Sequence, residues 1–366
     1  MRRRSGNPAL PVVVALAILG LALAGAPARE LPRAAGAHAP GSELAAPGAG
    51  SRRESAEAPS RAESPGAASR PPSLATPRPA AGFKVFLVPD MEGMAGTVFP
   101  REVLSGAEAG CETCRTSPDY ARFRRQMAED ANAVIAGARA AGATEFTVNE
   151  GHGGNDFANI EPFDLDPAAI LIRGWPKPRV MITGLDDSYD TVMFIGAHAN
   201  AGSPGVMAHN FAVDAFTVNG VSLNEVGINA LMAGQLGVSV SLVSGDDVLV
   251  AETHDMLGDF EDVVTKIAYG RTAAATYTPA KVQARLREAA RQAVLNERRG
   301  MYAPFVLSKP YRVEFTLRKS FTDKGDAVAG LTRYGLERTG PASFRFETND
   351  AFDIGDLMND LELIVF

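Results

Sequence analysis

The chain has 366 residues, of which 46% are hydrophobic and 22% are charged, with 36 basic and 43 acidic side chains. Residues 82–366 hold 26 of the basic and 38 of the acidic residues, so this part of the chain has a net charge of −12. Such an acid excess repels nucleic acid and anionic lipid, and we therefore expect no nucleic-acid partner and no membrane contact beyond the N-terminal segment.

Residues 1–28 have the pattern of a secretory signal peptide. Arg2, Arg3 and Arg4 precede an apolar stretch from Ala9 to Ala24, and small residues follow as possible cleavage sites. An apolar stretch of about 16 residues is short for a membrane-spanning helix. We expect a protein exported to the periplasm or the extracellular space, with an uncleaved N-terminal anchor as the alternative.

Residues 29–81 are rich in Ala, Pro, Gly, Ser, Arg and Glu and contain no aromatic residue, the first of the chain being Phe83. Such a segment buries too little apolar surface to offset the entropy lost on ordering. We predict a disordered linker here.

The segment 82–300 is predicted to be an α/β catalytic domain that binds metal. Strands and helices alternate along it, which indicates a mostly parallel sheet with helices on both faces. Residues 211–218 and 221–223 flank an Asn-Gly turn and predict a hairpin outside that sheet. Strands are predicted at 84–88, 145–148, 169–173, 192–195 and 239–243, and helices at 120–141, 224–235, 246–257 and 279–299.

The pattern of expected strands and helices changes after residue 300, and the segment 301–366 is predicted to form a smaller α+β lobe. It contains an alternating strand at 311–317, a helical stretch at 323–334, a strand at 343–348 and a last helix from Asp353. This lobe could belong to the same domain and contribute to contacts between copies of the chain.

Acidic and histidine side chains follow several predicted strands at the point where each strand ends. Asp90 and Glu92 follow the first strand, His152 the second and His198 a later one, while Glu225 opens a predicted helix. Ligands bind beyond the carboxyl ends of the strands in open α/β sheets, so we expect these side chains to converge. Each residue alone is more often structural than functional, and only the shared position favours a site.

Five such ligands are too many for one catalytic zinc, which takes about three protein ligands. A pair of divalent cations fits better, since three carboxylates offset most of the charge and two metals can activate water and polarise a carbonyl. A turn at 203–205 brings His209 back toward His198, and an unligated imidazole there is a candidate proton carrier.

Six ordered motifs resemble those of the zinc D-aminopeptidases of the DppA type. They lie at 88–93, 148–152, 184–187, 194–198, 204–209 and 224–230, within a similarity that runs from about Phe83 to the C-terminus. The departures are Glu150 in place of an expected Asp, an apparent insertion at 110–118, and the leader and linker.

The resemblance implies a dinuclear zinc metallopeptidase that removes N-terminal D-residues, above all D-alanine, from short peptides. It implies two Zn²⁺ per chain, held by Asp90, Glu92, His152, His198 and Glu225, with His209 as the catalytic histidine. It also implies a ring-shaped homo-oligomer, a decamer in the known fold.

Two alternatives stay open. One is another metal-dependent amidohydrolase on the same scaffold, and the other is a non-catalytic periplasmic protein that binds peptides or metal. Cys111 and Cys114 form the only cysteine pair, for which a local disulfide is the default outside the cytoplasm.

Overall fold

The computed structural model describes residues 82–104 and 118–365, which lie within a unit that spans Ala75–Phe366. The predicted signal peptide, the predicted linker, and Cys111 with Cys114 lie outside the described residues.

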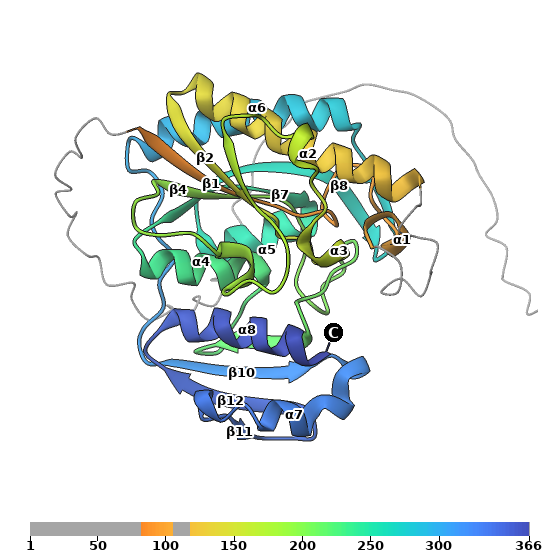
Figure 1. The fold of residues 1–366 in the computed structure, drawn as a ribbon, viewed down its shortest axis with the longest axis vertical. Coiled ribbons are helices and arrows are strands. Elements are labelled where there is room, and N and C mark those ends of the chain that lie inside the picture. Colours follow the sequence, from red (N-terminus) through yellow and green to blue (C-terminus); the bar gives the residue numbers. More distant parts are fainter. Residues whose placement is uncertain (1–81, 105–117, 366) are drawn as a thin grey trace, which may run out of the picture. The chain divides into compact units, whose positions relative to one another are not determined.

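Seven strands form a sheet in the order β3-β2-β1-β4-β7-β8-β9, in which all neighbours are parallel except β8 and β9 (Figure 1). The predicted mostly parallel sheet is thus confirmed. Its strands are β1 (Phe83–Pro89), β2 (Ala143–Asn149), β3 (Ala169–Ile172), β4 (Thr191–Ala197), β7 (Ser239–Asp246), β8 (Glu261–Gly270) and β9 (Ala273–Thr276).

Helices cover both faces of this sheet. On one face α2 (Pro118–Ala140) and α6 (Pro279–Glu297) pack against each other, and on the other lie α4 (Glu225–Gln235) and α5 (Asp247–Leu257) (Figure 1). Two short helices, α1 (Pro100–Val103) and α3 (Gly154–Phe157), follow β1 and β2.

Alternate residues of the central strands supply the two hydrophobic cores. In β1, Val85 and Leu87 join the core that includes α2 and α6, whereas Phe86 and Val88 join the core that includes α4. Successive side chains of a strand point to opposite faces, so a central strand with apolar residues throughout is buried on both sides. This burial holds the end of β1 firmly in place.

A second, antiparallel sheet has the order β11-β12-β10-β5-β6. The predicted hairpin forms part of it, so residues from the middle of the chain complete the C-terminal lobe. The strands are β5 (Val213–Val218), β6 (Val221–Ser222), β10 (Tyr311–Leu317), β11 (Glu337–Arg338) and β12 (Ser343–Thr348).

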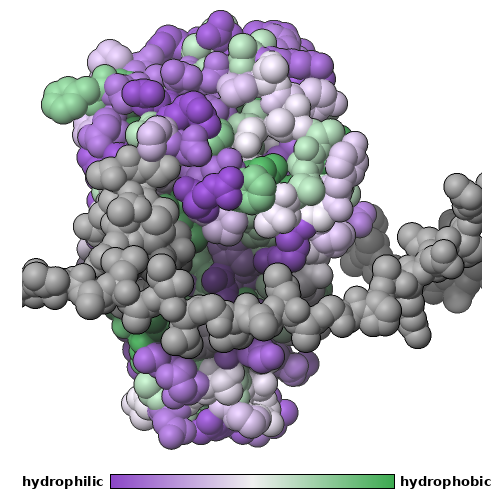
Figure 2. Space-filling model, turned by 90° about the vertical axis from the view of Figure 1, so that its right-hand side faces the viewer, coloured by the Kyte–Doolittle hydropathy of each residue, from purple (hydrophilic) through white to green (hydrophobic). Residues whose placement is uncertain are grey.

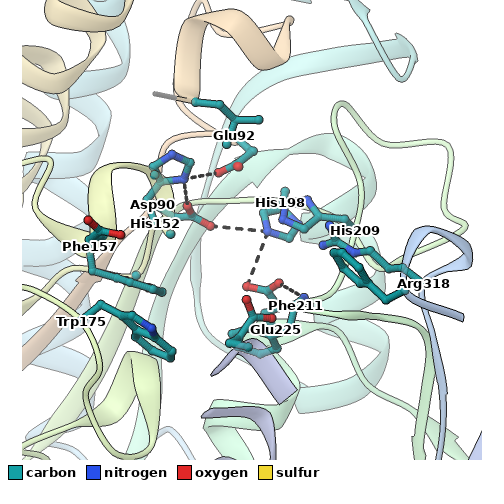
Figure 3. A pocket seen from close by; sticks show the side chains of 17 residues that line it. Asp90, Glu92, His152, Phe157, Trp175, His198, His209, Phe211, Glu225 and Arg318 are labelled. Carbon is teal, nitrogen blue, oxygen red and sulfur yellow. Dashed lines mark hydrogen bonds and ion pairs between the residues drawn. The ribbon is translucent and has the colours of Figure 1, made fainter. Parts of the chain in front are cut away.

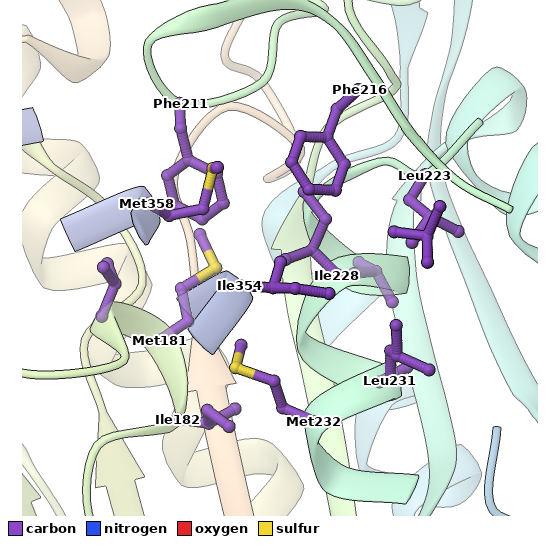
Figure 4. Packing of buried hydrophobic residues seen from close by; sticks show 14 of the residues in the cluster. Met181, Ile182, Phe211, Phe216, Leu223, Ile228, Leu231, Met232, Ile354 and Met358 are labelled. Carbon is purple, nitrogen blue, oxygen red and sulfur yellow. The ribbon is translucent and has the colours of Figure 1, made fainter. Parts of the chain in front are cut away.

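The last helix, α8 (Ala351–Val365), links the lobe to the main body. It contacts α4, and Ile354 and Met358 of α8 lie with Ile228 and Met232 of α4 in one apolar cluster (Figure 4). Because this core is continuous, the lobe holds a fixed position beside the ends of β1 and β4.

The prediction of one helical stretch at 323–334 is wrong in detail, because the segment is divided into short helices. The structure has a 3₁₀ helix at Lys319–Lys324, α7 at Gly325–Ala329 and another 3₁₀ turn at Thr332–Tyr334. Glycines at 325, 330 and 335 interrupt the pattern, and Gly335 has a positive φ of 63°. Further 3₁₀ turns lie at Pro162–Asp164 and Val180–Ile182.

Figure 2 shows the hydropathy of one face of the molecule. The face in Figure 2 is mostly hydrophilic, with hydrophobic side chains scattered over it. Among the described helices, none combines the length and apolar character needed to cross a membrane.

Candidate metal centre

The predicted ligands lie at the ends of three adjacent strands and at the start of one helix. Asp90 and Glu92 follow β1, His152 follows β2 and His198 follows β4, and the sheet order places β1 between β2 and β4. Glu225 is the first residue of α4 and reaches the same place (Figure 3). The structure therefore brings all five together.

One group consists of Asp90, Glu92 and His152, whose ligand atoms lie within 4.8 Å of one another. His152 Nδ1 is 3.2 Å from Asp90 Oδ1 and 2.9 Å from Glu92 Oε2. All three side chains are buried. We refer to them as the first triad.

A second triad consists of His198, His209 and Glu225, with the same 4.8 Å limit between ligand atoms. His198 Nε2 lies 3.6 Å from Glu225 Oε2 and 3.6 Å from Asp90 Oδ2. The two oxygens of Asp90 thus face one triad each. A single carboxylate connects two potential metal positions.

Backbone carbonyls fix the tautomer of each histidine. His152 Nε2 donates to the Val103 carbonyl at 2.5 Å, His198 Nδ1 to Ala199 at 3.2 Å and His209 Nδ1 to Met207 at 2.8 Å. A carbonyl accepts only, so these nitrogens carry protons, and the opposite nitrogens of His152 and His198 face the carboxylates. Orientation of this kind is typical of metal-binding histidines.

The carboxylates are oriented by the backbone as well. Asp90 Oδ1 accepts a hydrogen bond from the Met91 amide at 2.8 Å, and Glu225 Oε1 accepts one from the Phe211 amide at 2.6 Å. Gly93 allows the loop after β1 to approach β4, since a Cβ there would lie 1.8 Å from the Ala197 carbonyl oxygen. Only glycine fits at this position.

Burial and the neighbouring Glu92 raise the pKa of Asp90 to about 7. This shift reflects the cost of holding carboxylates close together away from water, which nearby cations would offset. Burial, followed by the charge of His198, lowers the pKa of His209 to about 4. The centre therefore favours bound cations and a neutral His209.

The donor set fits zinc. Imidazole nitrogens with free lone pairs and carboxylate oxygens are its usual ligands outside cysteine sites, and two triads joined by one carboxylate suit a pair of ions. His152 would contribute Nδ1 and His198 would contribute Nε2.

His209 differs from the other two histidines in its orientation. Its ring stacks on His198, with centroids 3.8 Å apart and planes 12° from parallel. A lone pair lies in the plane of its own ring, and a zinc–nitrogen bond is about 2.0–2.1 Å long. An ion held in the plane of His198 therefore lies off the lone-pair direction of His209, which favours His209 as a proton carrier.

Glu150 does not face the centre. Its carboxylate accepts hydrogen bonds from the backbone amides of Asn159 and Ile160 at 2.5 and 3.0 Å, and the Asn159 side chain also donates to the His152 carbonyl at 3.0 Å. Glu150 therefore shapes the loop that carries His152.

A buried lysine that the sequence analysis did not single out contacts the loop that carries Glu92. Lys266 Nζ donates to the carbonyls of Glu92 and Thr97, both at 2.5 Å, and burial lowers its pKa to about 7. It holds the loop of Glu92 in place. The sequence analysis did not find this role, because it predicted no strand at β8, which carries Lys266.

A cavity of about 390 Å³ opens over both triads. Phe157 and Trp175 line it with stacked rings 5.2 Å apart, and Phe211 and Arg318 also line it (Figure 3). The sequence analysis missed these four residues. Only Arg318 carries a signal that could have revealed it, because it directly follows a predicted strand.

Comparison with known proteins agrees with this geometry. Residues 83–359 match the family model of the D-aminopeptidases, peptidase family M55. A D-aminopeptidase of Bacillus subtilis (strain 168) is 33% identical over 273 residues, which cover 74% of this chain and 93% of the relative. The chain belongs to the D-aminopeptidase family.

A solved structure of this D-aminopeptidase family has the same fold. The Zn-dependent D-aminopeptidase DppA from Bacillus subtilis, described as a self-compartmentalizing protease, matches with a TM-score of 0.68 and 29% identity, over 77% of this chain and 97% of that one. The family resemblance inferred from the six motifs is confirmed. The match also confirms the α/β fold, and membership makes the chain a metallo-aminopeptidase, a hydrolase of peptide bonds.

Proposed function

We propose that this protein is an exported, zinc-dependent aminopeptidase that removes N-terminal D-residues, D-alanine above all, from short peptides. The observation that carries the proposal is the pair of triads joined by Asp90 at the floor of one cavity. We further propose two zinc ions per chain, with Asp90, Glu92 and His152 around one, and Asp90, His198 and Glu225 around the other.

Zinc bound there would polarise the scissile carbonyl and lower the pKa of a water molecule. The chain's own residues supply the rest of the chemistry. His209 Nδ1 donates to the Met207 carbonyl, so its Nε2 is free to accept a proton and pass it to the leaving amine. Burial lowers the pKa of His209, which favours its unprotonated form.

The cavity supports a short substrate. A volume of about 390 Å³ is at the lower end of the range for small-molecule sites. Phe157 and Trp175 form an apolar wall beside the first triad, where the side chain of an N-terminal residue would pack. Large folded proteins do not fit such a site.

Assembly and location are further proposals. The self-compartmentalizing relative supports a homo-oligomer, and we propose the ring-shaped decamer that the family resemblance implies. The signal pattern of residues 1–28 supports export to the periplasm or the extracellular space, with residues 29–81 as a linker.

A substrate panel tests the proposed activity. The zinc-loaded full-length protein is incubated with D- and L-aminoacyl amides and with D-alanyl peptides. We expect turnover of the D-alanyl compounds and little or none of the L-counterparts. Turnover of other amides alone would indicate another amidohydrolase, and stoichiometric binding without turnover would indicate a binding protein.

A further inference from the structure

Arg318 occupies a fixed position beside the metal centre. It directly follows β10, and its backbone amide donates to the Ala212 carbonyl at 2.8 Å, which anchors the start of its side chain. The half-buried side chain lines the cavity next to His209 (Figure 3).

Other arginines of the same lobe each pair with a carboxylate. Arg312 lies 3.2 Å from Glu347, and three others have partners at 2.6 to 2.7 Å: Arg333 with Asp360, Arg338 with Asp326 and Arg345 with Glu337. Within 82–104 and 118–365, no acidic side chain forms such an ion pair with Arg318. Asp90, Glu92 and Glu225 line the same cavity, but none of them forms an ion pair with Arg318. A half-buried guanidinium with no ion-pair partner among the described residues is available to a ligand.

The free space continues beyond Arg318. A second cavity of about 270 Å³ shares Glu92, His209 and Arg318 with the first and is also lined by Arg271. Phe157 and Trp175 do not line it. In Figure 3, Phe157 and Trp175 lie on the side of His152, whereas Arg318 lies beside His209 on the opposite side.

This arrangement gives the site a direction. The N-terminal residue of a peptide would lie beside the aromatic wall, with its scissile bond at the triads. The remainder of the peptide would then extend past His209 toward Arg318. A carboxylate loses hydration as it enters this cavity, and a guanidinium that receives it offsets this cost.

We propose that Arg318 binds the C-terminal carboxylate of the short peptide substrate and so selects peptides with a free carboxyl end. This inference rests on the proposed function. The planar guanidinium offers two parallel N–H donors to one carboxylate, a geometry that lysine cannot reproduce. Peptides whose carboxylate lies too far along the chain, or is blocked, lose this contact.

The test compares two substrates that differ only in the carboxylate, D-alanyl-glycine and D-alanyl-glycinamide. Arg318→Gln should lower kcat/KM for the acid by about 10- to 100-fold, mainly through KM, and change the value for the amide by less than about threefold. Arg318→Lys should keep part of the preference. Lys319→Gln removes the neighbouring charge outside both cavities and should leave both substrates unchanged.

Three results would overturn the inference: an equal loss on both substrates, no loss on either, or a loss in Lys319→Gln that matches Arg318→Gln. Zinc content and circular dichroism of each variant exclude a folding defect. If the wild type hydrolyses neither compound, the proposed function fails. Calorimetric binding of the same two compounds then decides the role of Arg318, since a preference for the acid that Arg318→Gln abolishes supports it and no preference contradicts it.

Discussion

Asp90 is the residue through which the two triads are connected. Its Oδ1 lies 3.2 Å from His152 and its Oδ2 lies 3.6 Å from His198, whereas Glu92 and Glu225 each face one histidine. The residues of the centre therefore differ in how many of the proposed metal positions would depend on them.

Metal content of single variants should reveal this difference. We expect Asp90→Ala to lose most of both zinc ions, because neither position keeps its full ligand set. Glu225→Ala should lose about one ion per chain, since the first triad is intact. Inductively coupled plasma mass spectrometry of dialysed protein measures the ratio. Equal losses in the two variants would contradict the role of Asp90 as the connection.

The stacked position of His209 predicts that its loss affects chemistry more than metal binding. His209→Ala should keep about two zinc ions per chain, and kcat should fall by about 10²- to 10⁴-fold, as for the loss of a general acid or base. His254→Ala alters a surface histidine of α5 and serves as the control. Loss of one zinc ion in His209→Ala would instead make His209 a ligand, and unchanged turnover would remove it from the mechanism.

At the scale of elements, the sequence predicted most strands of the main sheet, because buried parallel strands are short apolar runs between turn residues. The positions of Asp90, His152 and His198 followed from the ends of these runs. β8 and β9 were missed, since β8 is an amphipathic strand with polar residues such as Lys266 inside it. The pairing of the hairpin with β10 joins segments about one hundred residues apart, and local pattern carries no information on such a contact.

The interface between α2 and α6 contains a buried acid that links stability to pH. Asp130 of α2 is 3% exposed, its Oδ1 has no hydrogen-bond partner, and burial raises its pKa from 3.8 to about 7. Between about pH 4 and 7 the folded state holds this proton and the unfolded state does not. Stability conferred by the protonated carboxyl is therefore lost as pH rises through this window.

Asp130→Asn should remove this loss. We expect the difference in unfolding free energy, variant minus wild type, to be about 2 kcal/mol larger at pH 8 than at pH 5, which means that the variant gains stability relative to wild type as the pH rises. Urea unfolding at both pH values, at one protein and zinc concentration, measures the difference. Asp119→Asn, at an exposed position of the same helix, should show no such change. A difference that does not vary with pH would contradict the shifted pKa.

At the scale of the whole molecule, two sheets and a shared core bring a lobe from the C-terminal part of the chain over a metal centre built by the main sheet. The convergence of the two triads could be predicted from sequence, because most of their residues follow the ends of strands and all lie in family motifs. The cavity walls could not. Phe157 ends the short helix α3, Trp175 lies in a loop, and Arg318 belongs to a lobe whose placement depends on long-range packing. The proposed substrate specificity would therefore depend on the part of the structure that local sequence patterns predict least.

The central claim is that two zinc ions at these triads drive the release of N-terminal D-residues. Stepwise addition of zinc to metal-free protein, with hydrolysis of a D-alanyl peptide followed at each step, tests it most directly. We predict that activity rises to a maximum at two zinc ions per chain and that the L-alanyl peptide stays at least about 100-fold slower throughout. Full activity at one ion per chain, or no D-alanyl hydrolysis at two, would contradict the claim.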